Sequence, residues 1–202
     1  KPMKRLSLYL FLILFTFQTL SHADDIQDFQ IEGMRVGDSL LDYFSEKEIE
    51  DNIKRTSFKN KKYTKFEMYK HDSYKTYESA QVFFKKNDEK YKIYFVSGAL
   101  FDENINIKNC KKKDEIAEEI SKSISIKDVK INDEGIYSHP TDKSGESKVN
   151  ASTFRFLSGG YIKVTCVDYS KKIEEEWGWK DNVRVDIGTE EFSNFLVYEA
   201  YK

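Results

Sequence analysis

Proline is scarce in this chain, while aromatic residues are plentiful. Only two prolines occur in 202 residues, and aromatic residues make up 15% of the sequence. Disordered chains show the opposite bias, because they are rich in proline and poor in aromatic and β-branched side chains. The composition therefore indicates a folded protein rich in β-structure.

The sequence also lacks the motifs of several enzyme classes. It has no phosphate-binding loop, no glycine-rich dinucleotide motif, no HExxH, no CxxC and no Gly-x-Ser-x-Gly elbow. Of the three histidines, only His71 and His139 lie beyond residue 23, and neither belongs to a recognisable catalytic motif. We therefore expect no catalytic residue, no cofactor and no bound metal.

Charge of one sign is not concentrated anywhere. The 33 basic and 35 acidic residues give a net charge of −2 and are mixed along the chain. A nucleic-acid-binding protein would concentrate basic residues into a patch that neutralises phosphates. We expect no nucleic-acid partner.

The long apolar run is confined to the first residues. Lys4 and Arg5 precede a mostly apolar stretch from Leu6 to Leu20, and Ser21-His22-Ala23 then provides small residues at the positions that signal peptidases require. An uncleaved membrane anchor is the alternative, but it needs about 20 apolar residues, and polar side chains interrupt this run. The pattern predicts a signal peptide at 1–23, a periplasmic or secreted protein over 24–202, and no membrane span after cleavage.

Cys110 and Cys166 are the only cysteines. In an exported protein an even number of cysteines usually indicates disulfides. A metal or redox site is the alternative, although two isolated cysteines do not form a zinc pattern. We predict a disulfide between the start of a helix and a strand.

Residue periodicity predicts an ordered series of strands and helices. A capping box at Ser45–Glu48 should begin a helix, and isoleucines at 116, 120 and 124 form one stripe of another helix. Aromatic and β-branched alternation predicts strands, and Thr189 should cap a last helix. The expected strands are 26–36, 63–69, 77–85, 91–96, part of 126–136, 150–157, 161–169 and 183–187, and the expected helices are 40–44, 46–55, 111–124 and one after 189.

These elements predict an α+β domain, with antiparallel sheet covered on one face by helices. A helix followed by a strand meander occurs twice. The single domain over 24–202 would then consist of two halves, 24–108 and 109–202.

Two surface features are candidate binding sites. One is the polar stretch His139–Ser147, where His139, Asp142, Ser144 and Glu146 could hold a small polar ligand or a cation; the alternative is a turn shaped by its own backbone hydrogen bonds. The other is the pair Trp177 and Trp179, which could stack on a sugar ring or anchor a partner. Packing of these rings against the sheet is the alternative.

The stretch Ile31–Phe44 resembles the opening of small exported proteins of unknown role from AT-rich marine alphaproteobacteria, and the stretch His139–Ser147 and Cys166 add to this resemblance. Gly33–Ser39 also resembles the first turn of envelope modules with a tandem helix-then-sheet fold, such as small outer-membrane assembly lipoproteins and the β-lactamase-inhibitor fold. The first resemblance implies no function, and the second implies, by analogy, a binding role rather than a catalytic one.

The sequence is therefore consistent with two functions. The first is a non-catalytic envelope protein that binds another protein or a small ligand. The second is a hydrolase of envelope glycans that uses two carboxylates about 5–10 Å apart in a cleft, with Trp177 and Trp179 as a platform.

Overall fold

The computed structural model describes residues 25–102, 104–125 and 127–202. The predicted signal peptide at 1–23 lies outside the described residues. The elements in chain order are η1 (Ile26–Asp28), η2 (Leu40–Asp42), α2 (Glu46–Asp51), β1 (Ile53–Lys54), β2 (Tyr63–Tyr69), β3 (Ser79–Lys85), β4 (Phe95–Phe101), η3 (Ile107–Asn109), α3 (Lys111–Ser123), β5 (Val129–Ser138), β6 (Lys148–Phe156), β7 (Tyr161–Asp168), α4 (Lys171–Trp177), β8 (Asn182–Gly188) and α5 (Glu190–Tyr198).

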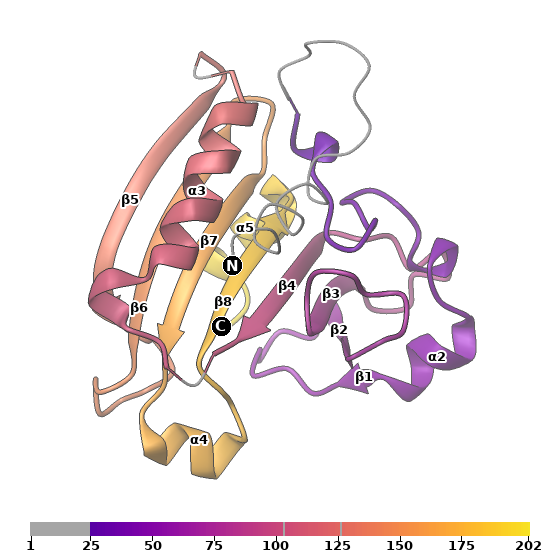
Figure 1. The fold of residues 1–202 in the computed structure, drawn as a ribbon. Coiled ribbons are helices and arrows are strands. Elements are labelled where there is room, and N and C mark those ends of the chain that lie inside the picture. Colours follow the sequence, from indigo (N-terminus) through magenta and orange to yellow (C-terminus); the bar gives the residue numbers. More distant parts are fainter. Residues whose placement is uncertain (1–24, 103, 126) are drawn as a thin grey trace.

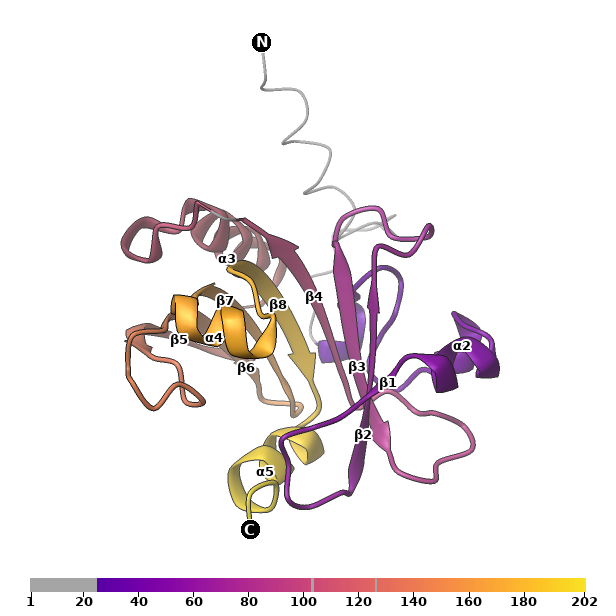
Figure 2. The same cartoon turned by 90° about the horizontal axis from the view of Figure 1, so that it is seen from below.

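All eight strands form one antiparallel sheet in the order β1-β2-β3-β4-β8-β7-β6-β5 (Figure 1). The α+β class is thus confirmed. The last strand of each predicted half lies at the centre, where β4 pairs with β8 from Phe95↔Gly188 to Phe101↔Asn182. Figure 2 shows that the strands on either side of this pair diverge, which makes one face of the sheet concave.

The convex face carries the larger core. Side chains alternate between the two faces of a strand, so Val82, Val96, Val164 and Val185 share this face and are buried. The helix α3 covers the second half, and the segment from Ile26 to Ile49 covers the first half and also reaches β6, where Phe29 packs on Phe156. This continuous apolar layer supplies most of the hydrophobic stabilisation.

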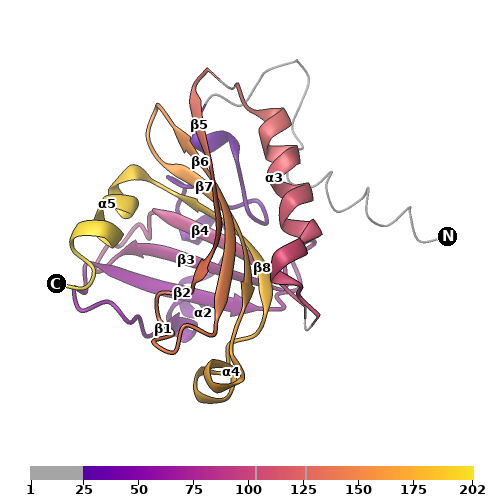
Figure 3. The same cartoon turned by 90° about the vertical axis from the view of Figure 1, so that its left-hand side faces the viewer.

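The concave face carries a smaller core at one end. Phe83, Phe95 and Tyr161 point to this side and pack against Phe192 and Phe195 of α5. Figure 3 shows α3 and α5 on opposite sides of the sheet. The prediction that helices pack on one face is therefore wrong, because aromatic residues on the second face give α5 its own apolar surface.

The N-terminal strand predicted over 26–36 is replaced by η1 and an isolated bridge between Ile31 and Met34. Glu32 and Gly33 have φ angles of 50° and 88°, a left-handed conformation that reverses the chain. The carboxylate of Glu32 accepts hydrogen bonds from the backbone amides of residues 75–77, at 2.7 Å each. The tight turn, and not strand pairing, therefore attaches this segment to the sheet.

Most of the other elements lie close to their predicted positions. The strand 63–69 and the capping box of α2 agree to the residue, and α3 contains the buried Ile116 and Ile120. The strand predicted over 91–96 begins later, at Phe95, because the Ile93 backbone pairs with residues 37 and 38 instead. The helix α4 was not predicted.

The disulfide between Cys110 and Cys166 is present, with Cα atoms 6.4 Å apart. Cys110 is the N-cap of α3 and Cys166 lies in β7, and both are buried. The bond attaches the start of α3 to the sheet in the way the sequence predicted. Within the described residues, no helix combines the length and apolarity needed to cross a membrane.

We predict that replacing both Cys110 and Cys166 by serine lowers the free energy of unfolding by about 4 kcal/mol. The two residues are 56 positions apart, and the chain-entropy model gives roughly this value for a loop of such length. Urea unfolding of the variant beside the oxidised and reduced wild-type protein would measure it. Labelling of two free thiols after denaturation of the unreduced protein would contradict the bond.

Candidate functional site

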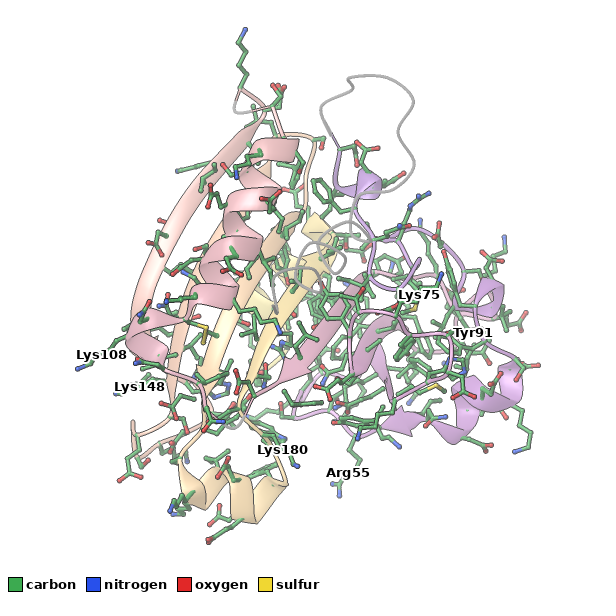
Figure 4. All side chains as sticks on the ribbon, viewed as in Figure 1. Arg55, Lys75, Tyr91, Lys108, Lys148 and Lys180 are labelled. Carbon is green, nitrogen blue, oxygen red and sulfur yellow. A yellow bond between two sulfur atoms is a disulfide. The ribbon has the colours of Figure 1, made fainter. Side chains whose placement is uncertain are left out.

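The concave face contains a cavity of about 880 Å³, which we call the trough. Its floor is formed by Lys65, Glu67, Gln81, Ala99 and Arg184, which lie on β2, β3, β4 and β8. Its rim is formed by residues 55–58 on one side and by Tyr169 with residues 177–181 on the other. In Figure 4 the labelled Arg55 and Lys180 lie at the same end of the molecule, close to α4.

Strand alternation and register place these floor residues together. Glu67 is paired with Gln81 across β2 and β3, and Ala99 is paired with Arg184 across β4 and β8. Each of these residues points away from the convex core, because its sequence neighbours point into it. A band of polar side chains therefore crosses the centre of the sheet beside the aromatic cluster under α5.

Glu67 is the centre of one hydrogen-bond network. Its carboxylate accepts bonds from Lys65 Nζ at 2.9 Å, Tyr69 Oη at 2.8 Å and Gln81 Nε2 at 2.6 Å. Burial opposes ionisation, but the hydrogen bonds and the charge of Lys65 outweigh it and lower the carboxyl pKa of Glu67. The group is therefore a fixed anion at neutral pH.

Arg184 is the centre of a second network. Its Nε lies 3.1 Å from Oδ1 of Asp186, which accepts a hydrogen bond from Ser97 Oγ at 2.6 Å. The charge of Asp186 raises the pKa of Arg184, so the guanidinium remains protonated. The Arg184 Nε makes no hydrogen bond within the described part of the chain.

Two neighbouring polar atoms are also unsatisfied. Asn182 Oδ1 and Thr165 Oγ1 are buried without a hydrogen-bond partner in the described residues. Asn182 lies two positions before Arg184 on β8, and Thr165 is paired with Arg184 across β7 and β8. Buried polar groups in folded proteins are nearly always hydrogen-bonded. The hydrogen-bonding capacity of these two buried atoms is therefore not filled by the described residues.

Aromatic rings form one wall of the trough. The His139 and Tyr169 ring centroids are 5.2 Å apart, Tyr169 and Trp179 are 5.3 Å apart, and Trp179 and Trp177 are 5.5 Å apart. Trp177 is 55% exposed, because the left-handed Gly178 ends α4 immediately after it. We call these four rings the aromatic wall.

The aromatic wall contains residues from both candidate binding sites of the sequence analysis. His139 comes from the candidate polar loop, and Trp177 and Trp179 form the candidate platform. Burial and, less strongly, the positive charge of Arg184 lower the pKa of His139. The imidazole is therefore neutral at pH 7 and acts as a polar edge of the wall.

The rest of the polar loop lies outside the trough. Asp142 is buried, and its two oxygens accept hydrogen bonds from Ser144, Ser147 and Ser170, including the side chains at 2.6, 2.6 and 3.1 Å. Those donors, first the Ser144 hydroxyl and then Ser147, hold the pKa of Asp142 well below its usual range. Glu146 is exposed. The oxygens of Asp142 are thus occupied by the loop itself.

The floor residues were missed by the sequence reasoning. Glu67 and Arg184 alternate with apolar residues in strands that were otherwise correctly placed. Polar residues facing away from a core usually face solvent, so this pattern alone did not distinguish a trough from an open surface. Glu67 lies on β2 and Arg184 on β8, and only the strand order of the folded sheet brings them to one face of the same cavity.

The carboxylates in the trough bear on the hydrolase hypothesis. Besides Glu67, the lining includes Glu78 and Asp181, which accept backbone amides of Phe101 at 2.9 Å and Tyr169 at 2.7 Å. Burial raises the pKa of Asp181. Each of the three carboxylates is therefore used to fix a strand or a loop, and His71 lies elsewhere, beside Ser73 and Glu48.

We predict that Asp142→Asn lowers the melting temperature at pH 7 by several degrees. The amide has only one acceptor oxygen, and its NH₂ group faces the donors that the carboxylate accepted. The stability due to the lowered pKa of Asp142 is fully present above about pH 4, the ordinary aspartate value, and is lost as the pH falls through the lower value of the folded protein. Thermal unfolding between pH 7 and pH 2 would therefore show the difference from wild type shrinking with acidification.

Glu146→Gln in the same loop is the matched control, because the Glu146 carboxylate is exposed and accepts no hydrogen bond in the described structure. It should melt with the wild-type protein. Equal destabilisation by both variants would contradict a structural role specific to Asp142.

Comparisons of the chain with protein-family models, with curated proteins and with solved structures found no match. The function of the trough is therefore argued from its own residues.

Proposed function

We propose that the protein is an exported, non-catalytic binding module whose ligand occupies the trough. The observation that carries the proposal is the exposed Trp177 ring, which lies beside Trp179 at the edge of a cavity with a polar floor. Exposed tryptophan is uncommon on a surface without a partner, and it is enriched where proteins bind. A cavity of about 880 Å³ is at the upper end of the range for ligand sites.

The polar groups of the trough favour binding over hydrolysis. A general acid needs a pKa near the working pH and access to the substrate. Glu67 has a lowered pKa and three hydrogen-bond donors, and Glu78 and Asp181 support backbone amides. Burial raises the pKa of Asp181, but its carboxylate holds the Tyr169 amide. These contacts favour groups that orient a bound molecule over groups that cycle a proton.

Export is the second element of the proposal. The basic and apolar pattern of 1–23 and the small residues before Asp24 support it. The Cys110–Cys166 bond supports it independently, because disulfides persist mainly in oxidising compartments. We place the working protein in the periplasm or outside the cell.

Tryptophan fluorescence would test the binding proposal directly, because the only two tryptophans of the chain are Trp177 and Trp179. We predict that at least one size fraction of an enzymatic digest of the native envelope shifts or quenches the emission. Trp177→Ala should weaken that binding at least tenfold, as loss of an aromatic anchor does. Calorimetry with the same fraction would measure the change.

Tyr198→Ala is the matched control, since Tyr198 is 61% exposed on α5 and does not line the trough. It should bind as the wild type does. If no fraction changes the emission, or if Tyr198→Ala weakens binding as much as Trp177→Ala, the trough is not the binding site.

We further predict that the exported protein begins at Asp24. Ser21-His22-Ala23 provides the small residues of a cleavage site, and the chain becomes acidic directly afterwards. Mass spectrometry of the protein isolated from its native envelope would identify the first residue. A species that retains Leu8–Phe15 would refute cleavage.

A further inference from the structure

The trough has an excess of positive charge although the chain as a whole is slightly negative. Its lining contains five basic and three acidic side chains, whereas the whole sequence has a net charge of −2. The basic residues are Arg55, Lys65, Lys70, Lys180 and Arg184. Lys65 is paired with Glu67, but Arg55, Lys70 and Lys180 form no ion pair within the described residues. The trough therefore favours a ligand with negative charge.

Arg184 provides the most specific part of this charge. Its side chain is 30% exposed, and Asp186 is its only ion-pair partner in the described structure. Its Nε is buried beside Asp186, so a ligand would meet the exposed part of the side chain. A planar guanidinium binds a carboxylate through two parallel hydrogen bonds, and this arrangement selects a planar anion as well as its charge.

A second polar atom next to Arg184 also lacks a partner. Asn182 lines the trough, is 6% exposed and has an unsatisfied Oδ1. This oxygen can accept only a donor such as a hydroxyl or an amide N–H. The ligand should therefore carry hydroxyl or amide groups close to its anionic group.

The aromatic wall adjoins this polar site. Arg184 and the four rings of the aromatic wall line the same cavity. Trp177 and Trp179 are tilted by 44° to each other, so they present two faces and not one flat stack. Flat apolar faces beside hydroxyl-binding groups suit sugar rings, which have one apolar side and a rim of hydroxyls.

The backbone around the floor argues against a peptide ligand. Peptides that bind sheets usually add a strand to a free edge. The strands β3, β4 and β8 at the centre of the trough are paired on both sides, and the edge β5 is remote from it. At the other edge, β1 already pairs with Lys65 and Phe66 of β2 beside the trough. Recognition in the trough therefore relies on side chains.

We propose that the trough binds a carboxylate-bearing glycan, with a sugar ring against Trp177 and Trp179 and the carboxylate on Arg184. Glu67, Gln81 and Asn182 would bind the hydroxyl or amide groups of the same ligand. This inference rests on the proposed function, because it names the ligand class of the same site. A single negative charge fits better than a phosphate dianion, since the ionised Glu67 also lines the floor.

The test uses two matched pairs of soluble oligosaccharides. One pair is hexagalacturonate and its fully methyl-esterified form, and the other is a muramic-acid-containing disaccharide and its carboxamide. In tryptophan fluorescence titrations at 50 mM salt, at least one acid should bind at least tenfold more tightly than its neutral counterpart. This preference should diminish at 500 mM salt, because exposed charges are then screened.

Arg184→Gln should bring the affinity for the acid to within about twofold of the affinity for its neutral counterpart. Arg155→Gln is the matched control, because Arg155 is exposed on β6 and does not line the trough. Arg184→Gln leaves Asp186 without its partner and could disturb the fold. The double variant Arg55→Gln/Lys180→Gln, at two exposed positions of the rim, therefore provides an independent measurement and should weaken the acid several-fold more than the neutral form.

The inference is overturned if neither acid binds more tightly than its neutral counterpart, or if charge removal at the rim weakens both forms equally. It is also overturned if a peptide or a single-stranded oligonucleotide changes the tryptophan emission and no sugar does. In either case, if an envelope fraction changes the tryptophan emission, the proposed binding function is still supported. Failure of every fraction and every sugar would refute both.

Discussion

The antiparallel pairing of β4 with β8 is the contact on which the rest of the structure depends. It joins the two strand meanders into one sheet and places Ser97 opposite Asp186 and Ala99 opposite Arg184. A shift of one residue would turn every side chain of one strand to the other face. The valines of the convex core would then point into the trough, and the charges would point into the core. Gly98 reinforces this register, because a Cβ there would lie 2.5 Å from the Tyr77 ring.

The two faces of the sheet at this central strand pair are covered differently. On the convex face, α3 and the N-terminal segment each cover one meander, and the Cys110–Cys166 bond ties α3 to β7. On the concave face, α5 covers only one end, and the neighbouring floor carries charged groups. The sheet is thus stabilised mainly from one side, and this leaves its other side available for polar groups that contribute little to the core.

The fold could be predicted from the sequence further than the site could. Local sequence patterns predicted three elements, namely the Ser45 capping box, the strand 63–69 and the helix with Ile116 and Ile120. The disulfide could be predicted because the chain has only two cysteines. The strand at 91–96 was misplaced because Ile93 alternates correctly but pairs with residues 37 and 38. The candidate residues His139, Trp177 and Trp179 were identified, but their association with Glu67 and Arg184 depends on strand order. Local periodicity carries no information about which strands become neighbours.

The polar groups of the trough floor contribute little to the stability of the fold. A buried or half-buried ion pair such as Arg184–Asp186 gains little net stability, because the loss of hydration offsets most of the attraction, and apolar replacements of similar volume are often as stable or more so. The unsatisfied Asn182 Oδ1 adds a further cost that a hydrophobic residue at the same position would avoid. Neighbouring strand positions on the same face already hold Phe83 and Phe95, so apolar packing is compatible with this part of the sheet. A protein under selection for stability alone would extend that aromatic cluster across the floor. The partly satisfied polar groups of the floor are therefore not explained by stability, and they are consistent with the proposed ligand site.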